Sequence, residues 1–449
     1  MSAHHPIRRP HAAVIALLAG LLVLAAACGS SSKKSSSGAT PSGPSTSAGG
    51  ETGSSASASA APPTSTAGTG KRPKADLVIW ADGNRAPVLQ KLGNEFGKAN
   101  GITVAVQTVD FAQLVPNFEH AAPVGEGPDI IVTAHDTTGE LIKDGLVDPI
   151  DLGKDASNYV PSSIAAFTQN GKLYGLPYAV EAVGLYTNTK LVKKPPTSWA
   201  QLVSEATTLK KAGKVKPAIG LPMGSDGNAY QPYGLVTASG GYLFKKSGTG
   251  YDQHDVGIDN AGGLKFAQSL TALCKQGLMS VDVTSDIAKQ AFIKGKVPFL
   301  LDGPWQLASF DAAKVPYAVT PIPPVNGGVA RPFVGVQGFI VSHFSKNSTL
   351  AKTFLVDYLN GPGPMRALYD VDKRPPALNA VAKQVETNPA IKGFLQAAAN
   401  GEPTPSIPAM TSVWKSWGQA YVLDMSGRQD PATAFKNAAK QIRIATKKN

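Results

Sequence analysis

The chain has 449 residues, of which 42% are hydrophobic and 16% are charged, which is enough material for two or three domains with buried cores. Its two cysteines exclude a disulfide scaffold, a zinc ribbon and an iron–sulfur cluster held by four cysteines. The net charge of +12 does not indicate nucleic-acid binding, because half of it lies before residue 75 and the rest is spread along the chain.

Residues 1–27 have the pattern of a secretory signal peptide. A short basic segment with Arg8 and Arg9 precedes a 16-residue apolar run from Ala12 to Ala27, and Cys28 follows directly. The run is short for a membrane span. A cysteine after small residues resembles a bacterial lipoprotein signal, which implies that Cys28 carries a lipid. An uncleaved membrane anchor and a plain cleaved signal are the alternatives.

Residues 28–74 are expected to form the lipidated cysteine and a flexible tether. Gly29 to Gly70 contains 14 serines in 42 residues and no aromatic residue, Leu, Ile, Val or Met. Such a segment buries too little apolar surface to offset the entropy lost on ordering. Lipid and tether together would hold the folded part at the outer face of the cell membrane. Cys274, on an apolar helical face, is expected to be a buried structural thiol.

Strands and helices alternate from residue 76 onwards. The predicted strands are Leu77–Trp80, Ile102–Val106, Asp129–Val132, Val183–Tyr186 and Pro298–Leu301. The predicted helices are one that contains Val88 to Phe96 and ends at Gly101, then Thr138–Lys143, Trp199–Leu209 and Leu264–Leu278. This alternation predicts an α/β fold with mainly parallel sheets flanked by helices. Ligands bind such sheets at the carboxyl ends of strands, so the loops after Trp80 and Val132 are the first candidates for a site.

Several common catalytic motifs are absent from the folded part. It contains no Walker A sequence, no glycine-rich dinucleotide fingerprint after a strand, no serine-hydrolase elbow and no HExxH zinc motif. The four histidines, which are expected at the surface or as caps, are His120, His135, His254 and His343. We expect neither a metal nor a cofactor. A glycoside hydrolase stays open, because it needs only two suitably spaced carboxylates.

Eight segments occur in the order and near the spacing of one known family over about residues 76–445. They are Leu77–Arg85, Gly127–Asp136, Pro177–Ala182, Gly240–Lys245, Phe292–Gly295 with Asp302–Trp305, Pro332–Val336, Ile407–Trp414 and Ser426–Arg428. The family they resemble is that of the maltose/maltodextrin-binding proteins, the solute-binding components of ABC sugar importers. The resemblance implies a two-lobed type II periplasmic-binding-protein fold with a multi-strand hinge, whose lobes close around a sugar.

The resemblance also implies where the lobes divide. The chain would cross between them near Tyr178–Val183, Val334–Phe339 and Pro376–Val385. Lobe 1 would then consist of residues 75–180 and 337–380, and lobe 2 of residues 181–336 and 381–449. The implied partners are a small-molecule carbohydrate and the separate permease chains in the membrane, with the protein itself acting as a monomer.

A sugar site needs polar groups for the hydroxyls and aromatic rings for the flat C–H faces. By resemblance, the polar contacts come from Asp82, Asn84, Arg85, Asp136 and Glu181. The last of these lies in an apolar segment at the first crossing, where a charge is unexpected unless it faces the site.

Three aromatic residues match stacking positions of the family. They are Tyr230, Trp305 and Trp414. Trp417 lies one helical turn after Trp414 and could either stack on the ligand or pack in the core.

Five positions depart from the family pattern. Where the family has a tryptophan, this chain has Thr133, and where the family has a basic residue, it has Thr137. A family glutamate is replaced by Asn228, an aromatic residue by Lys415 and an arginine by Gly418. A buried hydrogen-bond partner gained or lost is worth about 1–3 kcal/mol, enough to change the preferred sugar. The ligand is therefore expected to be maltose, a maltodextrin or a related α-glucoside, with trehalose included.

The sequence predicts a lipid-anchored extracytoplasmic protein that binds an oligosaccharide and delivers it to an ABC importer without chemical turnover. Two other functions stay open. A sugar sensor or adhesin would use the same site, and a secreted glycoside hydrolase would use Asp136 with Glu181 or Asp82.

Overall fold

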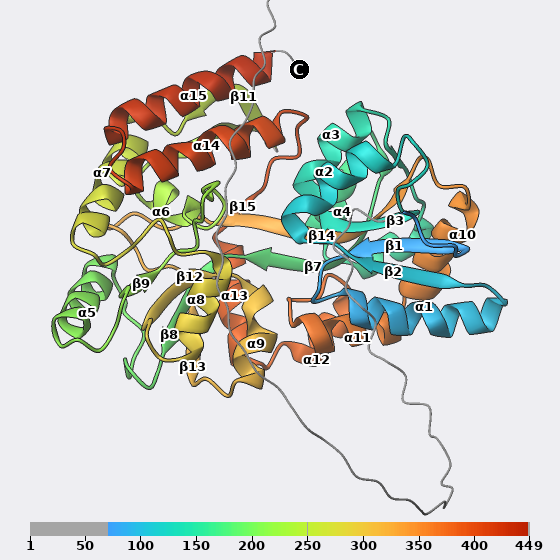
Figure 1. Ribbon diagram of the computed structural model, residues 1–449, viewed down its shortest axis with the longest axis horizontal. Coiled ribbons are helices and arrows are strands. Elements are labelled where there is room, and N and C mark those ends of the chain that lie inside the picture. The colour runs from blue at the N-terminus through green and yellow to red at the C-terminus, as the bar shows by residue number, and fades with distance from the viewer. Residues whose placement is uncertain (1–70, 249, 448–449) are drawn as a thin grey trace, which may run out of the picture. The chain divides into compact units, whose positions relative to one another are not determined.

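The computed structural model describes residues 71–248 and 250–447 (Figure 1). The predicted signal peptide, Cys28 and all but the last residues of the predicted tether lie outside this part of the chain. Among the described residues, no helix combines the length and the apolar character needed to cross a membrane.

The larger sheet has seven strands, in the order β15-β14-β3-β1-β2, with β4 and β7 also paired to β14. Its strands are β1 (Leu77–Ala81), β2 (Val104–Thr108), β3 (Ile130–Ala134), β4 (Val147–Asp148), β7 (Leu176–Ala182), β14 (Phe333–Ser342) and β15 (Glu402–Pro403). Strands β1, β2 and β3 are parallel, whereas β14 runs antiparallel to β3 and β7.

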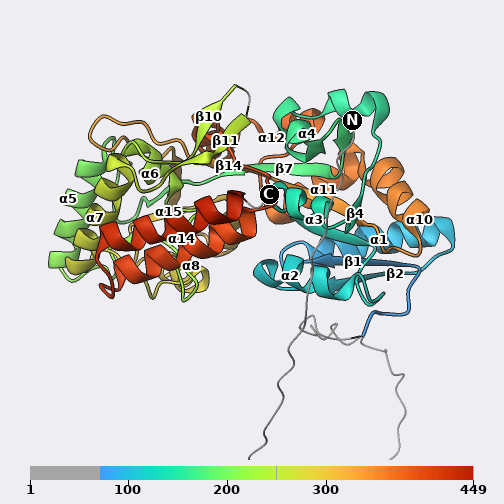
Figure 2. The same ribbon diagram turned by 90° about the horizontal axis from the view of Figure 1, so that it is seen from above.

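The smaller sheet has four strands, in the order β13-β8-β12-β9. They are β8 (Gly184–Asn188), β9 (Ile219–Gly220), β12 (Phe299–Asp302) and β13 (Tyr317–Thr320). Two hairpins are also present. One pairs β5 (Thr168–Gln169) with β6 (Lys172–Leu173). The other pairs β10 (Tyr242–Ser247) with β11 (Gly250–Gly257) (Figure 2). Only one residue, Val183, separates β7 of the larger sheet from β8 of the smaller one.

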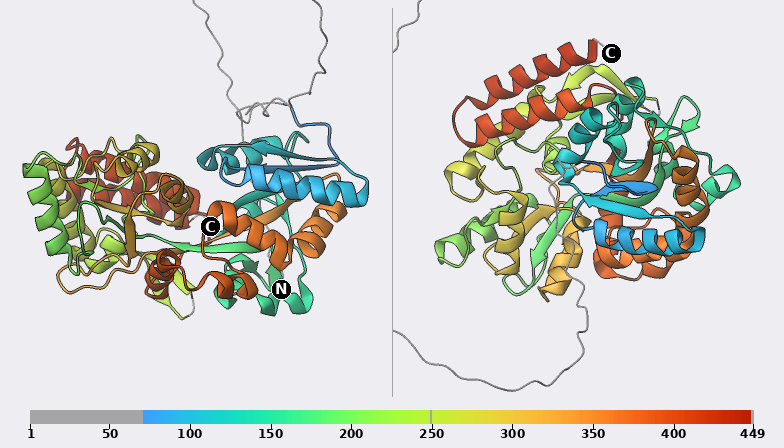
Figure 3. Two further views of the ribbon diagram at one scale, coloured as in Figure 1. Left: turned by 90° about the horizontal axis from the view of Figure 1, so that it is seen from below. Right: turned by 45° about the vertical axis from the view of Figure 1, so that its right-hand side comes forward.

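Helices flank both sheets. Those around the larger sheet are α1 (Ala86–Asn100), α2 (Phe111–Ala121), α3 (Thr138–Lys143), α4 (Pro161–Phe167), α10 (Ser348–Thr353), α11 (Pro362–Asp372) and α12 (Asn379–Val385). The others are α5 (Trp199–Lys211), α6 (Tyr233–Ala238), α7 (Ala261–Lys275), α8 (Ser285–Ile293), α9 (Leu307–Ala312), α13 (Pro389–Ala399), α14 (Met410–Met425) and α15 (Pro431–Lys447). The last two helices pack side by side (Figure 3).

The predicted α/β class and the predicted elements are confirmed, with small shifts at their ends. Helix α3 has the predicted bounds, and β2 begins two residues after the predicted strand, at Val104. Helix α1 ends at Gly101 because this residue adopts φ +68 and its N–H bonds to the carbonyl of Gly97. Two strands run against the predicted parallel course, and the local sequence pattern did not show either: β14 is antiparallel to β3 and β7 in the larger sheet, and β8 is antiparallel to β12 and β13 in the smaller one.

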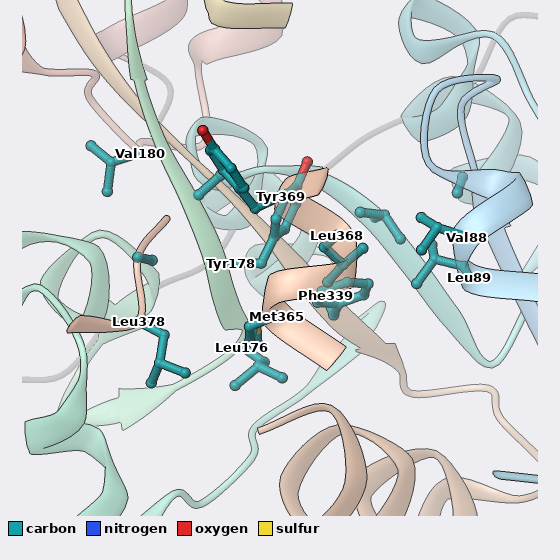
Figure 4. Packing of buried hydrophobic residues seen from close by; sticks show 14 of the residues in the cluster. Val88, Leu89, Leu176, Tyr178, Val180, Phe339, Met365, Leu368, Tyr369 and Leu378 are labelled. Atoms are coloured by element: carbon teal, nitrogen blue, oxygen red, sulfur yellow. The ribbon is translucent and has the colours of Figure 1, made fainter. Parts of the chain in front are cut away.

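Alternate residues of β1 enter two different cores, as the twofold period of a strand requires. Leu77 and Ile79 pack with Leu89 of α1, while Val78 packs on the opposite face with Phe118 of α2. The first of these cores continues to β7, β14 and α11 (Figure 4). The larger sheet is therefore covered by helices on both faces.

The core of the smaller sheet includes an unusual buried carboxylate on α14. Asp424 is fully buried, accepts a hydrogen bond from the Thr271 hydroxyl on α7 through Oδ1, and has no hydrogen-bond partner for Oδ2. Burial raises the pKa of Asp424 to about 7, against an ordinary value near 3.9. Between about pH 4 and pH 7 the folded protein therefore keeps a proton on Asp424 that the unfolded chain has already lost.

We predict that Asp424→Asn becomes progressively more stable than the wild type as the pH rises from about 4 to 7. The wild type loses stability over this window because the unfolded chain is stabilised by ionising at Asp424 while the folded protein keeps its proton, whereas the amide does not titrate in either state. Three pKa units correspond to a relative gain of at most about 4 kcal/mol. Urea unfolding of both proteins at pH 4.5 and pH 8 measures the difference.

Asp430→Asn is the sign control. A hydrogen bond from the Thr433 backbone lowers the pKa of Asp430, so this replacement should lose stability relative to the wild type as the pH rises through the range below about 4, and urea unfolding there measures this control. An Asp424→Asn difference that is equal at both pH values would show that Asp424 is ionised in the folded protein.

Candidate binding site

The first predicted site residues lie where β1 ends. Asp82 is partly buried and Asn84 is exposed, but the Arg85 side chain has 0% exposed surface. Arg85 forms an ion pair with Asp82. Burial alone would raise the pKa of Asp82, but the charge of Arg85 more than offsets this and the pKa lies below its usual value. In this structure Arg85 therefore holds Asp82 in place and is covered by protein.

Arg85 belongs to a closed circuit of hydrogen bonds between buried side chains, which we call the polar ring. Its members are Arg85, Tyr178, Glu181, Gln337, Asp372 and Arg374. On one side of the ring, Arg85 Nη1 donates to the Tyr178 hydroxyl at 3.1 Å, and this hydroxyl donates to Asp372 Oδ2 at 2.8 Å.

The other side of the polar ring runs through the predicted site residue Glu181. Arg374 forms an ion pair with Asp372 and donates from Nε to Glu181 Oε2 at 2.6 Å. Gln337 Nε2 donates to Glu181 Oε1 at 2.8 Å, and Gln337 Oε1 accepts from Arg85 at 2.8 Å, which closes the ring. The ring joins β7, β14 and the segment after α11. Glu181 is thus oriented through both of its oxygens.

The three predicted stacking residues lie together. The ring centroid of Tyr230 is 6.3 Å from that of Trp305 and 6.4 Å from that of Trp414. Phe333, which sequence reasoning missed, stacks on Tyr230 at 6.0 Å and stands edge-on to Trp414 at 5.6 Å. Trp305 and Trp414 keep part of their surface exposed, whereas Trp417 is fully buried and packs in the core.

Asp136, which follows strand β3 of the larger sheet, contacts this aromatic group. It lies in the single turn His135–Thr137 that follows β3, and its Oδ2 accepts a hydrogen bond from Trp414 Nε1 at 2.9 Å. Burial raises the pKa of Asp136, and the Trp414 hydrogen bond partly opposes this. A carboxylate and an indole that are 278 positions apart in the chain therefore share one site.

The expectation that His135 is a surface or capping residue is wrong. Its side chain is buried, its Nδ1 accepts from the Val336 N–H at 3.1 Å, and its Nε2 lies 2.9 Å from the Thr404 carbonyl oxygen. These two partners require the neutral tautomer protonated on Nε2, and burial lowers the pKa of His135 accordingly. His135 fixes the turn that carries Asp136 against β14.

Trp305 is positioned by the turn that follows β12. Asp302 is buried, and it accepts from the Gly303 N–H at 2.9 Å and from Gln306 Nε2 at 3.0 Å. The Tyr186 hydroxyl donates to the Gly303 carbonyl at 2.8 Å. Burial raises the pKa of Asp302 to about 6. Both ends of the Gly303 backbone are held, which fixes the direction in which Trp305 leaves the turn.

The remaining predicted residues have different surroundings. Asn228 Oδ1 accepts from the Tyr230 N–H at 2.9 Å, so Asn228 shapes the turn that presents Tyr230. Thr137 Oγ1 donates to the Ala134 carbonyl at 2.9 Å. Thr133 is buried in β3, and Lys415 is exposed on α14. The structure therefore places Asn228 and Thr137 in structural hydrogen bonds beside the site.

Four polar-ring residues and Phe333 are contributions that sequence reasoning missed. Asp372 and Arg374 precede Pro375 and Pro376, and they lie just before the stretch where the third crossing was expected. Two opposite charges beside a rigid Pro-Pro pair, next to a predicted crossing, were the one sequence feature that could have pointed to these ring residues. Within residues 71–248 and 250–447, no group of three or more His, Cys, Asp or Glu side chains is arranged to hold a metal ion.

Comparison with known proteins finds related sequences over most of the chain. Residues 91–393 match the family described as bacterial extracellular solute-binding protein. The galactooligosaccharide-binding protein of Bacillus subtilis is 28% identical over 379 residues, which cover 81% of this chain and 88% of the relative. The maltodextrin-binding protein MdxE of the same organism is 27% identical, with coverage of 82% and 90%. A maltooligosaccharide ABC transporter solute-binding lipoprotein of Streptococcus pneumoniae is 27% identical, with coverage of 85% and 91%.

Proposed function

Because the chain belongs to the bacterial extracellular solute-binding protein family, we propose that it binds an oligosaccharide at the residues around Trp305 and Trp414 and delivers it to an ABC importer. Family membership makes it a binding protein and not an enzyme. Relatives named for galactooligosaccharide, maltodextrin and maltooligosaccharide support an oligosaccharide as the ligand. Maltodextrins and related α-glucosides are the first candidates.

The grouping of three partly exposed aromatic rings with a carboxylate is the observation that carries this proposal. Tyr230, Trp305 and Trp414 offer ring faces, and Asp136 lies within hydrogen-bond distance of Trp414. Sugars present C–H faces and hydroxyls, so aromatic platforms beside acceptor oxygens are the groups that would bind them. Glu181 adds a second oriented carboxylate.

We propose that the two sheets are the cores of two lobes that close around the sugar. Lobe 1 would consist of residues 75–180 and 337–380, and lobe 2 of residues 181–336 and 381–449. The short passage from β7 to β8 through Val183 suits a hinge, because it permits rotation without a long linker. A ligand that touches Asp136 from one lobe and Trp305 from the other would favour the closed state by its extra contacts there.

The remaining parts of the proposal concern location and delivery. Lipidation of Cys28 would anchor the protein at the outer face of the cell membrane, as the name of the pneumococcal relative suggests. The closed monomer would then dock on the permease subunits. Sugar uptake by cells that lack the gene tests the delivery step, and unchanged uptake would refute it.

We predict that calorimetry on the purified full-length chain detects micromolar or tighter binding of at least one oligosaccharide. The panel is maltose, maltotriose, longer maltodextrins, trehalose and a galactooligosaccharide. Such affinity corresponds to about −8 kcal/mol or better. Trp305→Ala or Trp414→Ala should each weaken it by at least about 30-fold, since buried tryptophans at binding hot spots contribute about 2 kcal/mol or more.

The control is Phe344→Ala. Phe344 is an aromatic residue with 39% exposed surface that contacts His343 and none of the site residues, so its removal should leave the affinity unchanged. Absence of binding across the panel by folded protein would refute the oligosaccharide assignment.

A further inference from the structure

Arg374 lies at the point where the polar ring meets the aromatic group. Helix α11 ends at Lys373, which adopts φ +58, and the chain then runs beside β7. The Val180 N–H donates to the Pro375 carbonyl at 2.8 Å, and the Ala377 N–H donates to the Tyr178 carbonyl at 2.9 Å. These backbone bonds place the Arg374 side chain beside the end of β7, where Glu181 lies.

The guanidinium of Arg374 is held on three sides. Its Nε donates to Glu181 at 2.6 Å, its Nη1 pairs with Asp372, and its central carbon lies 5.8 Å from the centre of the Trp305 ring. Burial alone would lower the pKa of Arg374, but the negative charges of Asp372 and Glu181 raise this pKa by more than burial lowers it, so the side chain stays cationic. A planar cation can bond two carboxylates in its plane and contact an aromatic face at the same time.

We propose that Arg374 is a positioning residue of the ligand site, which holds the Trp305 ring and the Glu181 carboxylate in the orientation that binds the sugar. Asp372 fixes the guanidinium, the guanidinium fixes Glu181 and Trp305, and these two contact the ligand. The sugar part of this inference rests on the proposed function. Neither the family match nor the names of the relatives assign a role to this residue.

Arg366 provides a matched comparison inside the same protein. Its Nε pairs with Asp370 at 2.9 Å and its guanidinium lies 5.7 Å from the Tyr369 ring, so its chemistry is similar to that of Arg374. Its side chain is 43% exposed, and none of its partners, which are Asp370, Tyr369 and Gln384, belongs to the site. A general effect of losing an arginine–carboxylate–aromatic contact would therefore appear in Arg366→Lys as well.

The test compares Arg374→Lys with Arg366→Lys in the full-length chain, with maltotriose as the probe. Lysine keeps the charge beside the two buried carboxylates, so the protein should fold, but it loses the planar fork. We expect Arg374→Lys to weaken maltotriose binding at least tenfold and Arg366→Lys to change it less than twofold. Equal affinities of the Arg374→Lys variant and the wild type would overturn the proposal.

A double-mutant cycle with Trp305→Ala separates positioning from direct contact. If Arg374 acts largely through Trp305, the loss caused by Arg374→Lys should fall to less than about threefold when Trp305 is already alanine. A loss of full size in the Trp305→Ala background would overturn the positioning role with respect to Trp305.

A measurement without sugar keeps this inference distinct from the proposed function. Labelling with 5-fluorotryptophan gives one fluorine resonance for each of the five tryptophans, and Trp305→Phe identifies that of Trp305. Arg374→Lys should shift the Trp305 resonance, and Arg366→Lys should not. If the protein binds no sugar, the sugar function is refuted. If Arg374→Lys still shifts the Trp305 resonance in that case, the positioning role is supported. An unshifted resonance would overturn that role.

Discussion

Gly303→Ala should weaken oligosaccharide binding at least about 30-fold while the protein remains folded. A Cβ on Gly303 would overlap ring carbons Cζ3 and Cη2 of Trp305, which folds back over the glycine. These atoms belong to the far end of a side chain, so the least costly response is rotation of the indole. Trp305 would then leave its place beside Tyr230 and Arg374. Loss of a tryptophan contact at a binding hot spot costs about 2 kcal/mol or more.

Calorimetry with the sugar that the wild type binds best, together with thermal unfolding, checks this expectation. Gly363→Ala is the control, because a Cβ at Gly363 meets nothing within 4 Å and the site is not involved. Wild-type affinity in Gly303→Ala would mean that the sugar does not use the observed position of the Trp305 ring.

Gly227→Ala is expected to destabilise the fold itself, by about 2–5 kcal/mol. Gly227 adopts φ +75, which costs an L-residue about 1–2 kcal/mol. Its Cβ would also overlap the carbonyl group of Gly418 in helix α14, and overpacking adds about 1–3 kcal/mol. The overlapped atoms are backbone, so no rotamer change can relieve the contact. Such a loss is a large part of the 5–15 kcal/mol that stabilises a typical domain.

Gly213→Ala separates the two costs. Gly213 has a similar φ of +67, but a Cβ there meets nothing within 4 Å, so only the conformational cost should remain. Denaturant unfolding of both variants gives the difference. Equal losses in the two variants would contradict the close packing of the Gly227 turn on α14.

The same packing accounts for a departure noted in the sequence. Gly418 stands where the maltodextrin binders have an arginine, and a Cβ at this position would lie 2.7 Å from the Asp226 carbonyl oxygen. The turn around Asp226 and Gly227 occupies the space that a larger side chain would need. Gly418 is thus a packing residue in this protein.

Local sequence patterns determined the secondary structure, and the family resemblance of the sequence indicated much of the candidate site. The twofold and 3.6-residue periods of apolar residues depend on neighbours along the chain, and they placed β1, α1 and α3 within a few positions. The resemblance to the maltose/maltodextrin-binding family pointed to Asp136, Tyr230, Trp305 and Trp414, and the structure brings these side chains together.

The tertiary structure alone decided which side chains are reachable and which hold others in place. Arg85 and Gln337 are 252 positions apart, yet they share the buried ring that contains Glu181. Arg85 looked like a ligand contact and is covered, and His135 looked like a surface residue and is buried. Arg374 is one charged residue among many in the sequence, and it becomes a partner of Trp305 only when the segment after α11 lies beside β7 and near the turn that follows β12. Burial and long-range pairing depend on how distant elements pack, and no local pattern carries that information.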